Sequence, residues 1–256
     1  MYDSIFLDCD GVVTDTRARV DGRVMFEAYR LAHSGKRIAF VTGRSLDWLT
    51  RNIIPAISRM SPTPDEKARL FFVGECGNRW LSFSGGGLAH GEDDSHAIPA
   101  SVRSGVRQEM SRFPYLFFDE TKESFISLEI RHERLTSPQA EKEAHMQLSE
   151  AKGFLSSTYP AFSITQTLYA VDLMGKGVGK ASAARRALEL MGSTSSALII
   201  GDSEIDFEMG DELARSGIKF DFYYVGAEQP PRTAFQVKKA PAPYSEGALE
   251  VLRNVR

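Results

Sequence analysis

Two carboxylates stand one residue apart near the amino terminus, where Asp8-Cys9-Asp10-Gly11 follows a short apolar run. The glycine lets the chain turn sharply after the pair. Carboxylates held this close repel each other unless a cation, a shared proton or a substrate separates them. Asp-x-Asp-Gly alone is a weak signal, because aspartate and glycine are ordinary turn residues. Whether this stretch performs chemistry therefore depends on what the rest of the chain supplies.

Polar residues of compatible kinds follow the ends of other apolar runs. They are the hydroxyl of Thr42 and the amide of Gly43, the lysines Lys176 and Lys180, and the carboxylates of Asp202 and Asp206. Clustered carboxylates suit a hard cation such as Mg²⁺, which takes oxygen ligands. A hydroxyl, a backbone amide and a lysine suit a phosphate group. A carboxylate that attacks phosphorus needs both, because the cation offsets the repulsion between two anions.

These residues need a scaffold that brings them together. Apolar runs alternate with helical patterns before residue 84 and again after residue 175. Near-continuous apolar strands that alternate with helices are typical of a parallel sheet covered on both faces. We therefore predict an α/β fold with a doubly wound, Rossmann-like parallel sheet. The carboxyl ends of its strands would meet at one edge, where the polar residues would form a single site.

The character of the chain changes after Ser84. The glycines at 85–87 indicate a flexible joint, and the segment beyond them has two helical patterns, each followed by a pair of apolar runs. Helix, two strands, helix and two strands is typical of an α+β layer. We predict a cap domain of residues 85–174, inserted into a core domain of residues 1–84 and 175–256.

Composition narrows the class of protein. The net charge of −3 gives no basic field for nucleic acid or acidic lipid. No apolar run reaches the roughly 18 residues of a membrane span, and no secretory signal is visible. Cys9 and Cys76 are too few for a disulfide framework or a closed zinc site, and strand alternation places Cys9 toward the core. We expect a cytoplasmic protein that binds a small molecule, with neither nucleic acid nor membrane as partner.

The order of the motifs resembles the haloacid dehalogenase superfamily of phosphohydrolases. Asp-x-Asp-Gly at residue 8, Thr-Gly-Arg at residue 42, a distant lysine and Gly-Asp-Ser-x-x-Asp at residue 201 follow one another as in that superfamily, each beside a predicted strand. The wide gap between the second and third motifs resembles the branch with a large α+β cap. That branch includes Cof-type, sucrose-phosphatase-like and archaeal phosphoglycolate phosphatase-like members.

The resemblance implies roles for the matching residues. Asp8 would be the nucleophile that forms an aspartyl phosphate. Asp10 would be the general acid that protonates the leaving oxygen, and then the base that activates water. Thr42 and the amide of Gly43 would hold the phosphoryl oxygens. Lys180 aligns with the lysine that binds the phosphate, and Lys176, in the same glycine-rich loop, is the alternative.

The resemblance also implies a magnesium site. Mg²⁺ would be bound by Asp8, the carbonyl of Asp10 and Asp202, and Asp206 would support either the metal or Lys180. Cys76 stands where relatives have an asparagine, which puts a substrate contact from that position in doubt. Candidate substrate contacts, for which a solvent-exposed role fits equally well, are Arg44, Arg131 and His132.

The implied function is Mg²⁺-dependent hydrolysis of a small phosphorylated metabolite, a sugar phosphate first and phosphoglycolate second. A phosphomutase of the same superfamily would use the same aspartyl phosphate but pass the phosphoryl group to a bound sugar instead of water. A non-catalytic phospholigand-binding relative would be expected to lose Asp8 or Asp10, and both are present. A P-loop kinase is disfavoured because Met174 and Ala181 stand where its motif needs a glycine and a hydroxyl.

Overall fold

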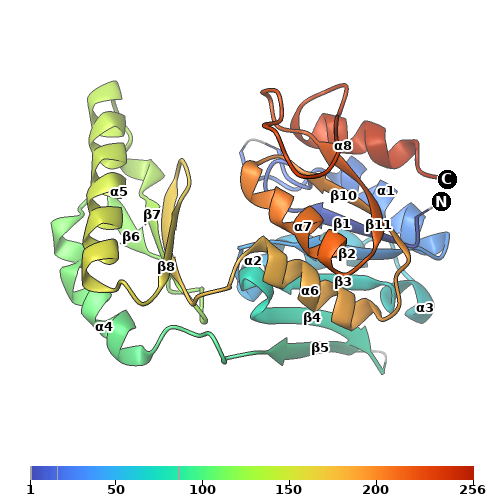
Figure 1. Ribbon diagram of the computed structural model, residues 1–256, viewed down its shortest axis with the longest axis horizontal. Coiled ribbons are helices and arrows are strands. Elements are labelled where there is room, and N and C mark those ends of the chain that lie inside the picture. Colours follow the sequence, from blue (N-terminus) through green and yellow to red (C-terminus); the bar gives the residue numbers. More distant parts are fainter. Residues whose placement is uncertain (1, 16, 86) are drawn as a thin grey trace. The chain divides into compact units, whose positions relative to one another are not determined.

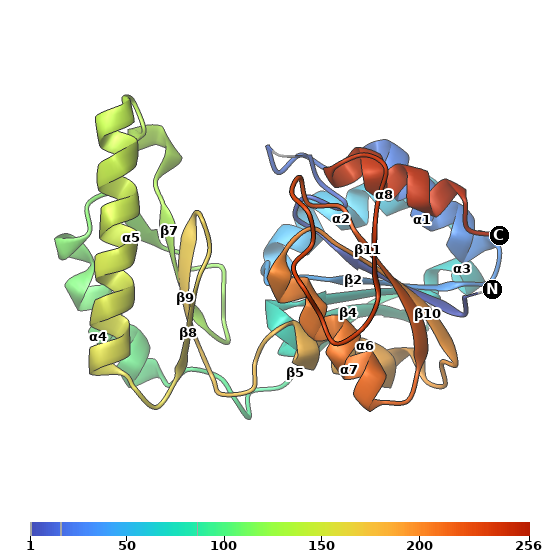
Figure 2. The same ribbon diagram turned by 45° about the horizontal axis from the view of Figure 1, so that its top comes forward.

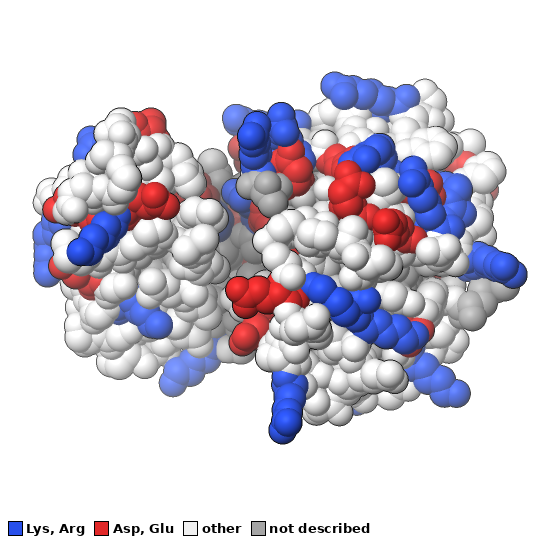
Figure 3. Space-filling view, turned by 90° about the horizontal axis from the view of Figure 1, so that it is seen from above, with Lys and Arg blue, Asp and Glu red and all other residues white. Residues whose placement is uncertain are grey.

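The computed structural model describes residues 2–15, 17–85 and 87–256. The chain forms two compact units, which are described separately (Figure 1). Met1–Glu92 and Gly179–Arg256 form the core unit, and Asp93–Val178 form the inserted unit. On the face drawn in Figure 3, basic and acidic side chains are interspersed. None of the helices in the described ranges combines the length and the apolar character that crossing a membrane requires.

The core unit is built on an eight-stranded sheet with the order β12-β11-β10-β1-β2-β3-β4-β5. The strands from β12 to β3 are parallel, and β4 and β5 add an antiparallel edge. The strands are β1 (Ser4–Asp8), β2 (Arg37–Val41), β3 (Leu70–Gly74), β4 (Arg79–Ser84), β5 (Gly87–Glu92), β10 (Ser196–Gly201), β11 (Lys219–Tyr224) and β12 (Val237–Lys239). The predicted parallel sheet is thus confirmed, with an antiparallel extension.

Helices cover both faces of this sheet (Figure 2). They are α1 (Gly22–His33), α2 (Leu46–Ser58), α3 (Pro64–Lys67), α6 (Lys180–Met191), α7 (Phe207–Arg215) and α8 (Tyr244–Arg253). Ile5 and Leu7 of β1 pack in one apolar cluster with α1, α2 and α8, whereas Phe6 packs in a second cluster with α6 and α7. Alternate residues of a strand point to opposite faces, so β1 is buried on both sides.

The order of the strands reverses at β1. The chain runs from β1 to β2 and β3 on one side, and returns through β10, β11 and β12 on the other. In open α/β sheets such a reversal leaves a crevice at the carboxyl ends of the two central strands, and ligands bind there. Asp8 ends β1 and Asp202 follows β10, so both stand at this crevice.

The inserted unit has a four-stranded antiparallel sheet of order β6-β7-β9-β8. Its elements are α4 (Ala100–Glu109), β6 (Leu116–Phe118), β7 (Ile126–Ile130), α5 (Pro138–Thr158), β8 (Ser163–Gln166) and β9 (Ala170–Met174). The long helix α5 packs along β7, β8 and β9 and buries Ala144, Leu148 and Leu155. Two helices and four strands follow in the predicted order.

The sequence indicated a joint where the structure has a hairpin. Ser84 pairs with Gly87 across the antiparallel strands β4 and β5, and Gly85 has a φ of +58°. Gly86, part of the expected joint, lies outside the described residues. Because β5 extends the core sheet, the inserted unit begins at Asp93 rather than at residue 85, and it ends at Val178 rather than at 174. Glycine and alanine within 87–92 weaken the strand signal, which explains the difference.

Candidate active site

Three carboxylates meet at the crevice between β1 and β10. Oxygens of Asp8, Asp202 and Asp206 lie within 4.8 Å of one another. Asp8 belongs to the first predicted segment, and Asp202 and Asp206 belong to the last. The structure therefore brings together aspartates that are almost 200 residues apart in the sequence.

Two glycines allow this approach. Gly11 has a φ of +69°, and a Cβ at this position would collide with the carboxylate of Asp202. A Cβ at Gly201 would likewise collide with the side chain of Asp206. Glycine alone combines a positive φ with the absence of a side chain. The turn after Asp8 can thus lie directly against the Asp202 carboxylate.

Asp206 fixes the turn that carries Asp202. Its side chain is fully buried, and its Oδ2 accepts hydrogen bonds from the amides of Asp202 at 3.0 Å and Ser203 at 3.1 Å. The hydroxyl of Ser203 donates to the same oxygen at 2.9 Å. These bonds saturate Oδ2, so the other oxygen, Oδ1, is the one that faces the cluster. It lies 2.9 Å from the Nζ of Lys180.

Lys180 neutralises part of the negative charge. It is the first residue of α6, and its Nζ forms ion pairs with Asp8 and Asp206 and donates to the carbonyl of Val41 at 3.1 Å. These contacts match the three N–H donors of an ammonium group. Lys176, the alternative lysine, is exposed and lies in the inserted unit. Lys180 is therefore the lysine that reaches the carboxylates.

The surroundings shift the protonation equilibria of the cluster. Burial, and then the charge of Asp206, raise the pKa of Asp8 well above its usual value and that of Asp202 to about 7. Burial by itself would lower the pKa of Lys180, but Asp206 and Asp8 outweigh it and raise that pKa. One lysine thus faces three carboxylates, and a divalent cation would relieve the remaining repulsion.

A short segment after β3 positions the start of α6. The hydroxyl of Ser182 donates to the carbonyl of Cys76 at 2.8 Å and accepts from the amide of Gly179 at 2.9 Å. The amide of Cys76 donates to the carbonyl of Thr42 at 3.1 Å. These contacts use the backbone of Cys76, so the exchange of asparagine for cysteine leaves them intact. Sequence reasoning missed Ser182, although a serine in the first turn after a glycine is a capping signal.

Thr42 and Gly43 follow β2, the strand next to β1. Val41 is in register with Asp8, so Thr42 stands beside the end of β1. Thr42 is 1% exposed, and its hydroxyl oxygen accepts from the amide of Arg44 at 3.0 Å. The Thr42 side chain is also hydrogen-bonded to the side chain of Cys9. Within the described part of the chain, the amide of Gly43 takes no backbone acceptor.

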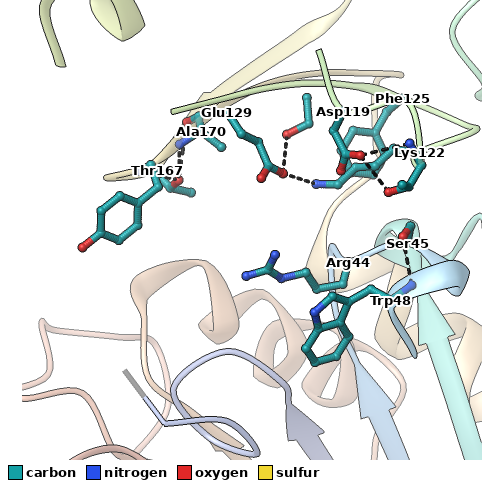
Figure 4. Close-up of polar contacts among 12 residues, drawn as sticks. Arg44, Ser45, Trp48, Asp119, Lys122, Phe125, Glu129, Thr167 and Ala170 are labelled. Carbon is teal, nitrogen blue, oxygen red and sulfur yellow. Dashed lines mark hydrogen bonds and ion pairs between the residues drawn. The ribbon is translucent and has the colours of Figure 1, made fainter. Parts of the chain in front are cut away.

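Asp10 is paired with Arg44. The Nε and Nη2 of Arg44 donate to the two carboxylate oxygens of Asp10 at 3.0 and 2.9 Å. The guanidinium also lies 5.5 Å from the centre of the Trp48 ring. Figure 4 shows the side chains of Arg44 and Trp48 beside each other. Ser45 caps α2 by accepting from the amide of Trp48 at 3.2 Å. The structure thus pairs Arg44 with the carboxylate of Asp10, and a substrate contact of Arg44 stays a prediction.

No protein-family model and no curated protein matches this sequence. Solved structures match over nearly the whole chain. A haloacid dehalogenase-like hydrolase from Bacteroides thetaiotaomicron superposes with a TM-score of 0.67 at 17% identity, covering 100% of both chains. The chain has the haloacid dehalogenase fold. The C-terminal domain of trehalose-6-phosphate phosphatase from C. albicans gives a TM-score of 0.71 at 14% identity, covering 97% of this chain and 90% of that chain. The structure of Thermoplasma acidophilum 0175 superposes with a TM-score of 0.66 at 17% identity, covering 99% of this chain and 97% of that chain.

The donor set fits the metal implied by the haloacid dehalogenase fold. The ligand atoms of Asp8, Asp202 and Asp206 are all oxygens, which Mg²⁺ prefers. Mg²⁺ binds oxygen at about 2.0–2.1 Å, so two of its ligands lie at most about 4.2 Å apart. The three oxygens lie within 4.8 Å of one another, which is close to this limit. The Oδ2 of Asp206 already holds the Asp202 turn, so Asp8 and Asp202 are the side chains that we propose as direct ligands.

The candidate residues of the inserted unit are engaged within that unit. The Nε of Arg131 donates to the carbonyl of Leu116 at 3.0 Å, and its guanidinium lies 5.8 Å from the Phe117 ring centre. The ring of His132 lies 5.3 Å from that of Tyr169. Arg131 and His132 remain predicted substrate contacts.

The sheet of the inserted unit also carries a polar cluster that sequence reasoning missed. Ser127 and Glu129 alternate with apolar residues along β7, and Ser127 donates to Glu129 at 3.3 Å. Lys122, only 6% exposed, lies 3.4 Å from the same carboxylate (Figure 4). The alternation of polar and apolar residues in 126–130 was the available signal.

Proposed function

We propose that the protein is a Mg²⁺-dependent phosphomonoester hydrolase that acts through an aspartyl phosphate on Asp8. The observation that carries this proposal is the cluster of Asp8, Asp202 and Asp206 oxygens within 4.8 Å, with Lys180 paired to two of them. It stands at the strand reversal where α/β sheets bind ligands. Mg²⁺, when bound, would supply charge neutralisation between the substrate phosphate and the carboxylates.

The first half-reaction transfers the phosphoryl group to the protein. A carboxylate oxygen of Asp8 attacks phosphorus, and the bond from phosphorus to the ester oxygen breaks. Asp10 gives its proton to the departing oxygen. In the second half-reaction Asp10 takes a proton from water, and the resulting hydroxide attacks phosphorus. Inorganic phosphate leaves and the carboxylate of Asp8 is restored.

Neighbouring groups hold the reactants during these steps. The Thr42 hydroxyl and the Gly43 amide donate to the phosphoryl oxygens, and Lys180 offsets their charge. Arg44 holds both oxygens of Asp10, and each oxygen keeps a further lone pair for the proton. Arg44 therefore orients the acid without preventing proton transfer.

We propose a sugar phosphate as the first substrate class and phosphoglycolate as the second. The similarity in fold to a trehalose-6-phosphate phosphatase supports the first class. A panel that contains trehalose 6-phosphate, glucose 6-phosphate and 2-phosphoglycolate distinguishes them by the inorganic phosphate released. A phosphomutase would instead convert a sugar phosphate to its isomer without releasing phosphate. We also propose that the protein is cytoplasmic, as the sequence led us to expect.

The test is the turnover of p-nitrophenyl phosphate. We expect hydrolysis that requires Mg²⁺, stops with EDTA and falls at least about 1000-fold in Asp8→Asn. Asp211→Asn is the matched control, because Asp211 is exposed on α7 in the same unit. Circular dichroism should show that both variants fold. Turnover that survives EDTA, or that survives in Asp8→Asn, would contradict the proposal.

A further inference from the structure

A second site lies at the other end of the core sheet. A cavity of about 600 Å³ is formed where β1, β2 and β3 begin, and its lining includes Lys36, Arg37 and Arg69. Asp8 and Thr42 stand at the opposite ends of these strands. A five-residue strand such as β2 spans roughly 16 Å. This cavity is therefore separate from the candidate active site.

The chain turn after α1 places Lys36 in the cavity wall. Gly35 has a φ of +94°, its amide donates to the carbonyl of Ala32, and the amide of Lys36 donates to that of Leu31, each at 3.0 Å. Such a glycine turn ends a helix and redirects the chain. It sends the residue after it directly into β2. The position of Lys36 is thus set by the backbone and does not depend on a partner for its ammonium group.

Lys36 lines the cavity without a counter-charge among the described residues. It is 7% exposed, and among the described residues its ammonium group forms no ion pair, hydrogen bond or ring contact. Its stem is buried, but its ammonium nitrogen is not among the buried, unpartnered polar atoms of the described residues, so the charged end reaches the open space of the cavity. A residue of this kind in the wall of a cavity indicates that an anion from outside the chain completes the pairing.

The other charges of the cavity favour an anion. Arg37 donates to the carbonyl of Met191 at 2.9 Å and Arg69 to that of Ala32 at 3.5 Å, so each spends a donor on the backbone and keeps others. One carboxylate, Asp3, lines the same cavity. Its Oδ2 accepts from the amides of Ser195 and Ser196 at 3.0 and 3.2 Å. The lining thus holds three cationic side chains against one carboxylate that is already hydrogen-bonded.

The apolar residues of the cavity wall favour an organic anion over an inorganic ion. Phe71 and Phe83 line the cavity together with Leu190 and Met191 at the end of α6. Such surfaces bind rings and aliphatic chains, and a few well-placed polar groups set the orientation of the ligand. We propose that this cavity binds an organic anion, with a phosphate, sulfonate or carboxylate at Lys36 and a ring or aliphatic portion against the two phenylalanines.

Fluorescence titration with 8-anilinonaphthalene-1-sulfonate tests this proposal, and N-phenyl-1-naphthylamine supplies similar rings without the sulfonate. The variant Lys36→Met keeps the length of the side chain and removes its charge. Lys142→Met is the control, because Lys142 is exposed on α5 of the inserted unit. We expect Lys36→Met to weaken binding of the sulfonate about tenfold or more and to leave the neutral probe unchanged. Lys142→Met should bind both probes as the unmodified protein does.

Thermal unfolding without any probe separates ligand binding from a structural role. Removing a charge that has no partner among the described residues should leave the melting temperature of Lys36→Met equal to that of the unmodified protein. Equal sulfonate affinity in Lys36→Met and the unmodified protein would overturn the proposal. So would no binding by the unmodified protein, an equal loss in Lys142→Met, or a lower melting temperature in Lys36→Met. None of these results depends on phosphatase activity.

Discussion

The two ends of the core sheet each carry a lysine of low exposure, but only one of the two ammonium groups is paired within the described residues. Lys180 and Lys36 are both 7% exposed. Lys180, at the carboxyl ends of the strands, has ion pairs with Asp8 and Asp206. Lys36, at the amino ends, has no partner for its ammonium group within the described residues. The chain itself supplies the counter-charge of Lys180, whereas we propose that an external anion supplies that of Lys36.

The largest expected effect separates these two lysines. Lys180→Met leaves Asp8, Asp202 and Asp206 without their counter-charge, and breaking a buried ion pair costs roughly 3 kcal/mol. We expect a loss of about that size in the free energy of unfolding, measured by urea denaturation without Mg²⁺, and loss of phosphatase activity. Lys36→Met should change neither quantity. Equal destabilisation by the two substitutions would contradict the account that Lys180 is paired and Lys36 is not.

The next effect tests how tightly the carboxylate end is packed. Gly11→Ala places a Cβ against Asp202 and forces a side chain into a positive φ. We expect about 1–3 kcal/mol of destabilisation. A loss of kcat/KM should accompany it, because the carboxylates move apart. Gly22→Ala is the control: a Cβ there meets open space at the start of α1, where alanine is favoured. If Gly11→Ala and Gly22→Ala had the same free energy of unfolding and the same kcat/KM, the turn at Gly11 would not lie against Asp202 as described.

The smallest effect concerns Asp10. Arg44→Gln removes the guanidinium that holds both oxygens of Asp10, but it leaves the nucleophile and the carboxylate cluster in place. We expect kcat to fall about tenfold, with little change in KM for p-nitrophenyl phosphate, because the acid is misoriented rather than lost. Arg51→Gln removes a similar but exposed pair with Asp47, 2.9 Å long, and should change neither constant. A larger change in KM than in kcat would assign Arg44 to substrate binding.

The sequence predicts the carboxylate end far better than the amino end. Asp8, Thr42 and Asp202 each follow an apolar run, and parallel strands bring their carboxyl ends together. Strand order therefore converts spacing in the sequence into proximity in space. Lys36 precedes a strand in the same way, but nothing in the sequence shows whether a lysine is paired, because pairing depends on which side chains pack around it.

Side-chain pairs between segments that are distant in the sequence could not be predicted either. The bonds of Arg44 to Asp10 and of Ser182 to Cys76 depend on the exact approach of a loop and a helix. Strand β5 was missed because small residues in 87–92 give a weak strand pattern. Propensity and periodicity describe single elements, whereas these features arise from contacts between elements.

The central claim is that Asp8 and Asp202 share one divalent cation. Anomalous scattering from a crystal soaked in Mn²⁺, which accepts the same oxygen ligands as Mg²⁺, tests it directly. We predict one strong peak at the crevice between β1 and β10, within coordination distance of both carboxylates. A peak that contacts only one of them, or manganese bound elsewhere with none at this crevice, would contradict the claim.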